Sequence, residues 1–281
     1  MNKWIIGARP RTLPAAIAPV LVATSYAGSA WDPIHALSAL LVSLALQIGV
    51  NYANDYSDGI RGTDDSRIGP VRLTASGLAS PKSVRTAALI SFLIAAVIGL
   101  TLAASTSWWI ILIGALSINA AWGYTGGTNP YGYKGLGEIS VFLFFGIAAT
   151  VGSYFVQVEE LNLQIFIIAV PMGSLACAIL AINNLRDRAQ DQIVGKKTLA
   201  VRLGDLGARR LYIALLISAH IFALLTFKPG VLLTLLATPL TWKLARGVAS
   251  GVTGADLIPF LARTGKLQLL FAALFALGLA I

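Results

Sequence analysis

The chain has 281 residues, of which 57% are apolar and only 12% are charged, and its mean hydropathy is +0.77. This composition excludes a water-soluble domain and predicts an all-α protein with several membrane-spanning helices. The net charge of +9 is typical of a membrane protein whose Lys and Arg gather on one side of the bilayer, so no nucleic-acid partner is expected.

The predicted spans are apolar stretches of about 17 to 20 residues, because a helix of roughly 20 residues crosses the hydrocarbon core of a bilayer. The last stretch is the shortest, so the sequence predicts nine transmembrane helices and leaves eight as the alternative. The first stretch has no small-residue cleavage site and is expected to stay in the mature protein. In chain order the predicted spans are 12–30, 36–53, 87–105, 108–124, 138–156, 164–183, 211–227, 230–246 and 267–281.

The distribution of basic residues predicts how the spans are oriented. With the N-terminus in the cytoplasm, every Lys and Arg except Lys228 falls on the cytoplasmic side. Because positive residues concentrate on that side of membrane proteins, we expect a cytoplasmic N-terminus. Long inner loops then lie at about 54–86, 125–137 and 184–210. Any chemistry is expected on these loops and on the helix ends beside them.

Two clusters of Asn and Asp stand at the cytoplasmic ends of the second and sixth spans, NYANDYSDG at 51–59 and NNLRDRAQD at 183–191. In the first cluster, Asn51, Asp55 and Asp58 are spaced i, i+4, i+7, which places them on one stripe of a helix. Unpaired carboxylates are costly at the edge of a bilayer, so such clusters indicate a site for a cation or a substrate.

The second cluster has a similar spacing, because Asn183, Asp187 and Asp191 run i, i+4, i+8. Carboxylates four residues apart on a helix repel one another, so a positive charge is expected between them. Asn183 and Asp187 also repeat the spacing of Asn51 and Asp55. Two four-span halves in the same orientation, followed by a ninth helix, would produce this repeat.

The ligand types favour a hard cation. Oxygen donors without Cys or His nearby suit Mg²⁺, which completes its coordination with phosphate oxygens and water. A diphosphate is the best-matched polyanion, because basic residues that follow both clusters supply donors for its free oxygens. These residues are Arg61, Arg67, Arg72, Lys196 and Lys197. The alternative is that the bases only enforce topology and the Asn and Asp residues end helices.

The two clusters resemble the paired Asp-rich motifs of the UbiA superfamily of intramembrane aromatic prenyltransferases. Within it, the chain is most similar to the 1,4-dihydroxy-2-naphthoate polyprenyltransferases of menaquinone biosynthesis. The similarity lies in ARPRTLPAAIAPV at 8–20, RIGPVRLTASG at 67–77 and NNLRDRAQDQIVGKKTLAVRLG at 183–204. The resemblance extends over essentially the whole chain.

The resemblance implies one domain, 1–281, with nine helices in a ring around a central cavity in a prokaryotic cell membrane. The loops at about 54–86 and 184–210 would cap the cavity, and the active site would face the cytoplasm. The cofactor would be Mg²⁺, and the substrates a polyprenyl diphosphate and 1,4-dihydroxy-2-naphthoate.

The resemblance also implies the metal ligands, one ion being held by each motif. The matching residues are Asn51, Asp55 and Asp58 for one ion, and Asp187 and Asp191 for the other. Asn54, one turn before Asp58, is an alternative to Asn51. Asn183 and Asn184 are expected among the substrate contacts.

The expected chemistry follows from charge. Mg²⁺ and the bases would stabilise the leaving diphosphate, and aromatic faces would steady the allylic cation in a cavity closed to water. Tyr124, at the inner end of the fourth span, is the candidate for the second role, with an interfacial tyrosine as the alternative. The naphthoate ring would then attack and lose its carboxylate as CO₂. Arg11 and Lys134 are the candidates to hold that carboxylate.

The long apolar donor is expected to pass between helices into the lipid. Small residues in the fifth span, Gly146, Ala148, Ala149 and Gly152, would line this path, although helix packing explains them equally well.

Two other functions fit parts of the sequence. One is a prenyltransferase for another acceptor, such as 4-hydroxybenzoate, a haem, a chlorophyllide or a sugar phosphate. The other is a membrane transporter, which would need acidic residues or broken helices near the middle of its spans. The acids here gather at one face instead.

Overall fold

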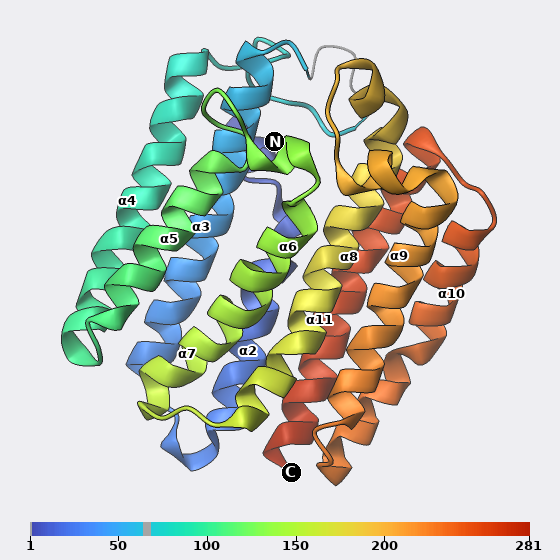
Figure 1. Ribbon diagram of the computed structural model, residues 1–281. Helices are drawn as coiled ribbons and strands as arrows, with labels where there is room; N and C mark the ends of the chain where they lie inside the picture. Colours follow the sequence, from blue (N-terminus) through green and yellow to red (C-terminus); the bar gives the residue numbers. More distant parts are fainter. Residues whose placement is uncertain (1, 64–68) are drawn as a thin grey trace.

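The computed structural model describes residues 2–63 and 69–281, and within them every regular element is helical (Figure 1). The elements in chain order are α1 (Lys3–Ala8), η1 (Pro10–Thr12), α2 (Pro14–Ala27), η2 (Gly28–Ala30), α3 (Pro33–Ile60), α4 (Pro81–Ser105), α5 (Trp109–Gly123), η3 (Tyr131–Lys134), α6 (Gly137–Val141), η4 (Phe142–Ala148, a π-helix), α7 (Ala149–Val158), α8 (Leu163–Ile193), α9 (Leu199–Leu224), η5 (Pro229–Ala237), α10 (Thr238–Ala249), η6 (Gly254–Leu257) and α11 (Ile258–Ala280).

The chain is a multi-pass membrane protein. In the described part of the chain, six helices are long and apolar enough to cross a bilayer, or up to seven if the pair Lys3–Thr12 and Pro14–Ala30, bent by 52°, forms one span. The fourth predicted span corresponds to α5, a shorter apolar helix of 15 residues. The eighth corresponds to η5 followed by α10, where the helix type changes at Thr238.

The last span differs from the prediction. The sequence placed its start at 267, but α11 begins at Ile258 and carries Arg263 and Lys266 within the helix. Both helices that carry the Asn/Asp clusters also run further than the predicted spans, since α3 ends at Ile60 and α8 at Ile193. Both clusters are therefore helical along their whole length, as the spacing of their side chains requires.

Capping side chains fix where four long helices begin. Asp32, Ser80, Asn162 and Thr198 each accept a hydrogen bond from a backbone N–H in the first turn of α3, α4, α8 and α9 respectively. Such caps satisfy amides that have no partner inside the helix. The cap at Thr198 begins α9 directly after the two lysines that follow the second cluster, and so ends the loop between α8 and α9 after a few residues.

The long helices form two groups, and each group contains one of the two helices that carry the Asn/Asp clusters, α3 and α8. Figure 1 shows α3, α4 and α5 together on one side and α8 to α11 on the other, with α6 and α7 in front and α2 behind. The α8 helix forms the most buried span, since 78% of its apolar window is buried, against 22% for α3. The outward faces of the other helices expose large apolar side chains, as expected for contact with lipid tails.

Two small residues of the fifth span have different surroundings. A Cβ added at Gly146 would lie 2.5 Å from the Cα of Gly173 in α8, so η4 and α8 touch backbone to backbone at this point. A Cβ at Gly152 would meet nothing within 4 Å, and Gly152 lines the central cavity with Ala148 and Ala149. Gly146 therefore serves helix packing, whereas the other three border the cavity.

We expect Gly146→Ala to lower the melting temperature of the detergent-purified protein. Overpacking a tight contact costs about 1–3 kcal/mol, and the atom that blocks the new methyl group is backbone, which cannot rotate away. Gly152→Ala is the matched control, because its methyl group has open space and alanine favours the helix. Equal melting temperatures for the two variants, measured by tryptophan fluorescence, would contradict the close contact between η4 and α8.

Candidate active site

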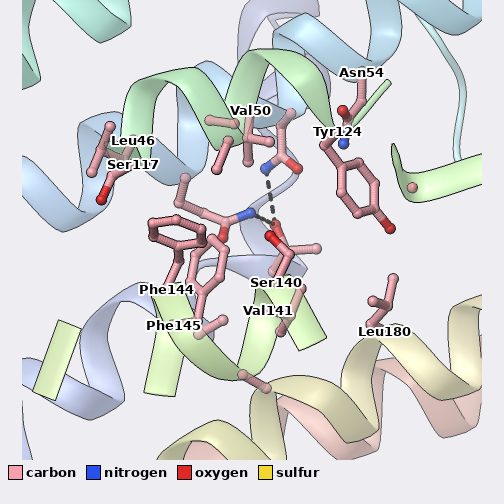
Figure 2. A pocket seen from close by; sticks show the side chains of 18 of the residues that line it. Leu46, Val50, Asn54, Ser117, Tyr124, Ser140, Val141, Phe144, Phe145 and Leu180 are labelled. Atoms are coloured by element: carbon pink, nitrogen blue, oxygen red, sulfur yellow. Dashed lines mark hydrogen bonds between the residues drawn. The ribbon is translucent and has the colours of Figure 1, made fainter. Parts of the chain in front are cut away.

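A cavity of ≈ 890 Å³ joins the two Asn/Asp clusters, although they lie far apart in the sequence. Its polar end is lined by Asn54, Asp58, Asn183, Asp187 and Asp191, among others. In Figure 2, Asn54 and Tyr124 lie toward one side of the cavity, and Leu46, Ser117, Phe144 and Phe145 gather toward the other. A concave site with a few convergent polar groups and a large apolar part suits a ligand with a charged head and a hydrocarbon tail.

Asp58 is the meeting point of three segments. Its Oδ1 accepts hydrogen bonds from the Tyr133 hydroxyl and from Nζ of Lys196, the latter at 3.3 Å. The same Nζ lies 4.5 Å from the centroid of the Tyr133 ring, a cation–π distance. Burial, followed by the negative charge of Asp58, raises the pKa of Tyr133, so this hydroxyl stays protonated and keeps donating. These contacts join the end of α3 to η3 and to the loop after α8.

Asp55 has a different environment, although it belongs to the same motif. It is 0% exposed, and its Oδ2 and Oδ1 accept hydrogen bonds from the backbone N–H groups of Leu73 and Thr74, both at 2.8 Å. It does not line the cavity, whereas Asp58 does. Three residues turn a helix by about 300°, so the two carboxylates lie roughly 60° apart around α3. The helical spacing of the motif alone did not predict that Asp58 lines the cavity and Asp55 does not.

Two asparagines of the first cluster line the cavity and are oriented by neighbouring segments. The amide nitrogen of Asn51 donates to the carbonyl of Ala8 and to Oγ1 of Thr12, both at 2.9 Å. The Oδ1 of Asn54 accepts from the Thr125 hydroxyl at 2.7 Å. Asn51 thus holds the N-terminal segment against α3, and Asn54 holds the loop that follows α5.

The second cluster contains an arginine that the sequence reading did not select. Nε and Nη2 of Arg186 donate to Oδ1 and Oδ2 of Asp187, each at 2.7 Å. Nη2 also donates to Oδ1 of Asn183 at 2.8 Å. Asp191 lines the same wall of the cavity, as does Asn184, whose amide nitrogen donates to Glu138 at 2.9 Å. The sequence does contain a sign of this role, because Arg186 is the basic residue inside NNLRD and lies between the polar residues that were selected.

The other predicted bases separate into two groups. Arg11, Arg72 and Lys196 line the cavity. Arg61, Lys134 and Lys197 do not: Arg61 donates to the carbonyls of Thr125 and Gly127, and both lysines are exposed. Arg67 lies outside the described residues.

Arg9 is a further cavity residue that sequence reasoning missed. It has a left-handed backbone with φ 52°, a conformation that costs an L-residue roughly 1–2 kcal/mol. Its side chain lines the cavity, and its Nη2 is buried without a hydrogen-bond partner in the part of the chain that the structure describes. An unpartnered guanidinium nitrogen in a cavity wall is suited to bind an anion.

Aromatic rings line the polar end of the cavity. Tyr124 and Tyr131 meet edge to face, with ring centroids 5.6 Å apart, and both line the cavity together with Tyr133. A Cβ at Gly132 would lie 2.6 Å from the carbonyl oxygen of Tyr124. The glycine therefore lets the loop fold back and bring the three rings to one place.

The donor set fits hard cations. Among the described residues, no three His, Cys, Asp or Glu side chains form a ready group for a metal ion. Asp58, Asp187 and Asp191 nevertheless bring carboxylates to one cavity, and positive side chains already stand at two of them, Lys196 at Asp58 and Arg186 at Asp187. Carboxylate ligands on two walls of one cavity suit Mg²⁺ ions that complete their coordination with phosphate oxygens.

Comparisons with known proteins give matches over most of the chain. The model of the UbiA prenyltransferase family matches residues 16–255. The 1,4-dihydroxy-2-naphthoate octaprenyltransferase of Mycobacterium tuberculosis (strain ATCC 25618 / H37Rv) is 49% identical over 286 residues, covering 99% of this chain and 97% of that protein. The protein of the same name from Escherichia coli (strain K12) is 40% identical, covering 98% and 94% respectively.

Solved structures share the fold. A UbiA homolog from Archaeoglobus fulgidus bound to GPP and Mg²⁺ has a TM-score of 0.71 and 16% identity, covering 100% of both chains. The apo structure of a UbiA homolog from Aeropyrum pernix K1 has a TM-score of 0.73 and 13% identity, covering 94% of this chain and 96% of that one.

Proposed function

The chain belongs to the UbiA prenyltransferase family, and we propose that it transfers a polyprenyl group from an allylic diphosphate to 1,4-dihydroxy-2-naphthoate. Diphosphate and CO₂ leave, and the product is demethylmenaquinol, the reduced form of demethylmenaquinone, a step of menaquinone biosynthesis. The observation that carries this proposal is the single cavity in which two Asp-containing motifs meet at a polar end and continue into an apolar part. The names of the relatives that match nearly the whole chain give the same acceptor, 1,4-dihydroxy-2-naphthoate, and this supports the proposal.

The proposal includes a place in the cell. The protein would lie in a prokaryotic cell membrane as one domain of nine helices, with α5 and the η5–α10 segment as further spans beside the long helices. The N-terminus and the motifs would face the cytoplasm, where the basic residues gather. The segments at about 54–86 and 184–210 would close this end of the cavity.

The diphosphate would lie at the polar end of the cavity. Asn54 and Asp58 would hold one Mg²⁺, and Asp187 and Asp191 the other; Asn51, which also lines the cavity, is the alternative amide ligand. Bound Mg²⁺ neutralises the charge that develops on the leaving diphosphate.

Two bases would contact the diphosphate directly. Arg72 and Lys196 would donate to its free oxygens, which favours departure of the anion when the allylic carbon–oxygen bond breaks. Lys196 donates to Asp58 at 3.3 Å, and Arg72 lines the same cavity.

The allylic cation and the hydrocarbon chain would occupy the rest of the cavity. Tyr124 and its neighbouring tyrosines present ring faces and edges near the diphosphate, where they stabilise the cation and exclude water. Phe144, Phe145, Ala148 and Gly152 border the apolar part, which suits a polyprenyl chain running toward the lipid.

The acceptor would be held by its carboxylate. Arg9 and Arg11 line the cavity on the N-terminal segment, and the buried nitrogen of Arg9 can donate to the carboxylate. The ring carbon that bears the carboxylate attacks the allylic carbon. The electron pair of the broken carbon–oxygen bond has left with the diphosphate. The bond to the carboxylate then breaks, CO₂ leaves, and its electron pair restores the aromatic ring.

Product formation tests the acceptor. Purified protein is given a polyprenyl diphosphate, Mg²⁺, and either 1,4-dihydroxy-2-naphthoate or 4-hydroxybenzoate, and products are read by mass spectrometry. We expect demethylmenaquinol from the naphthoate alone, detected as the quinol or as the demethylmenaquinone that air oxidation forms from it. A product only from 4-hydroxybenzoate would keep the mechanism and change the acceptor, and no product from either would overturn the proposal.

Removal of the metal tests the role of the Asp motifs. We expect EDTA to stop turnover and excess Mg²⁺ to restore it, because without the metal the carboxylates of the site would repel the diphosphate. Turnover that persists in exhaustively chelated membranes would contradict metal-assisted departure of the diphosphate.

A further inference from the structure

Arg186 has an unusual contact within the second motif. It is 5% exposed, and its guanidinium covers both carboxylate oxygens of the next residue, Asp187, at 2.7 Å. Consecutive residues on a helix point about 100° apart and do not normally meet. The arginine side chain nevertheless makes this pair and occupies both oxygens of the carboxylate.

The guanidinium also has capacity for a second anion. Its Nη1 is buried without a hydrogen-bond partner among the described residues, and the side chain lines the cavity. A Cβ added at Gly69 would lie 3.3 Å from Cζ of Arg186, so the loop before α4 approaches the guanidinium with a residue that has no side chain. A planar donor with a free N–H beside a cavity is suited to bind diphosphate oxygens.

We infer that Arg186 competes with the metal ion for Asp187 and, once displaced, binds the diphosphate. This inference rests on the proposed function. A guanidinium and a divalent cation repel each other at one carboxylate, so binding of the metal requires the arginine to leave. The diphosphate that arrives with the metal supplies a new anionic partner within the same cavity. Arg186 thereby couples occupation of the second metal position to the presence of the diphosphate.

The competition predicts two opposite shifts in Arg186→Gln. Without the competing cation, Mn²⁺ alone is expected to bind about tenfold more tightly, because it no longer has to displace a guanidinium from the two oxygens of Asp187. Inorganic diphosphate is expected to bind the Mn²⁺-loaded variant about tenfold more weakly, because its guanidinium ligand is gone. Both affinities are read by electron paramagnetic resonance of Mn²⁺ in the purified full-length protein, so neither depends on turnover.

Two further variants complete the experiment. Arg186→Lys keeps the positive charge but loses the bidentate contact with Asp187. It is expected to change the affinities for Mn²⁺ and diphosphate in the same directions but by smaller factors. It replaces the Gln variant if that variant does not fold. Arg188→Gln is the matched control, because Arg188 lies two residues along the same helix and pairs with Asp205 at 3.9 Å instead. Its affinities for Mn²⁺ and diphosphate should equal those of the wild type.

The outcomes separate this inference from the proposed function. A tighter Mn²⁺ site with weaker diphosphate binding supports the competition. Unchanged Mn²⁺ affinity, or weakening of both ligands together, overturns it and leaves Arg186 as a structural or simple anion-binding residue. A wild-type protein that binds no Mn²⁺, even with diphosphate present, overturns the metal site of the proposed function itself.

Discussion

Asp58→Asn is expected to lower turnover by about a thousandfold or more while the protein stays folded in detergent. Removing one group that stabilises developing charge typically costs 10²–10³ in rate, and here the lost charge would also weaken the hold on the metal. The new amide group would further present N–H donors to the ammonium of Lys196, which now lies 3.3 Å from the carboxylate. Turnover at saturating polyprenyl diphosphate and naphthoate measures the effect.

The control for Asp58→Asn is Asp205→Asn. Asp205 is an acid outside the cavity, paired with Arg209 at 2.6 Å on α9. It does not line the cavity, so the variant should keep turnover near that of the wild type. Full turnover in Asp58→Asn would remove Asp58 from the metal site, and a lowered melting temperature would assign the loss to folding instead.

Much of the architecture could be predicted from the sequence, because hydrophobic length and charge act locally. Apolar stretches long enough to cross a bilayer became helices, and the clusters at the ends of the second and sixth spans lie at one cavity. The predicted start of the last span was wrong, because Arg263 and Lys266 read as a loop but lie in the early turns of a continuous helix, α11. A charge count cannot distinguish a loop from the charged end of a helix.

The roles of individual site residues could not be predicted in the same way. Asn183 and Asp187 repeat the spacing of Asn51 and Asp55, yet Asp187 lines the cavity and Asp55 does not. Tertiary contacts make this difference, because the loop before α4 supplies backbone amides to Asp55. No spacing within α3 specifies those donors.

The residues that sequence reasoning missed share a physical reason. Arg9 acquires its importance from a buried nitrogen in the cavity wall, and Tyr133 and Arg186 acquire theirs from hydrogen-bonding partners. None of the three stands at a diagnostic spacing. Lys134, by contrast, was selected as the basic residue of its loop, and it is exposed outside the cavity. The position of a basic residue in a loop near the motifs did not predict that its side chain lines the cavity.

Asp55→Asn is expected to inactivate the enzyme by a different route, through loss of the loop before α4. The carboxylate satisfies two buried backbone N–H groups, and leaving such a group unsatisfied costs about 1–3 kcal/mol. An amide can accept only one of these bonds, and its NH₂ group opposes the other N–H. The same loop carries Gly69 and Arg72 in the cavity wall. We therefore expect a lower melting temperature and roughly a hundredfold loss of turnover.

The comparison of Asp55→Asn with Asp58→Asn decides whether one motif contains two kinds of acid. If Asp55 acts through the loop, its variant melts at lower temperature, exchanges the amide hydrogens of Leu73 and Thr74 faster, and still binds Mn²⁺ below its melting point. The Asp58 variant should show the converse, normal melting with weakened Mn²⁺ binding. Normal melting and lost Mn²⁺ binding in Asp55→Asn would make Asp55 a ligand, as the helical spacing predicted, and would require the loop to release its carboxylate when the metal binds.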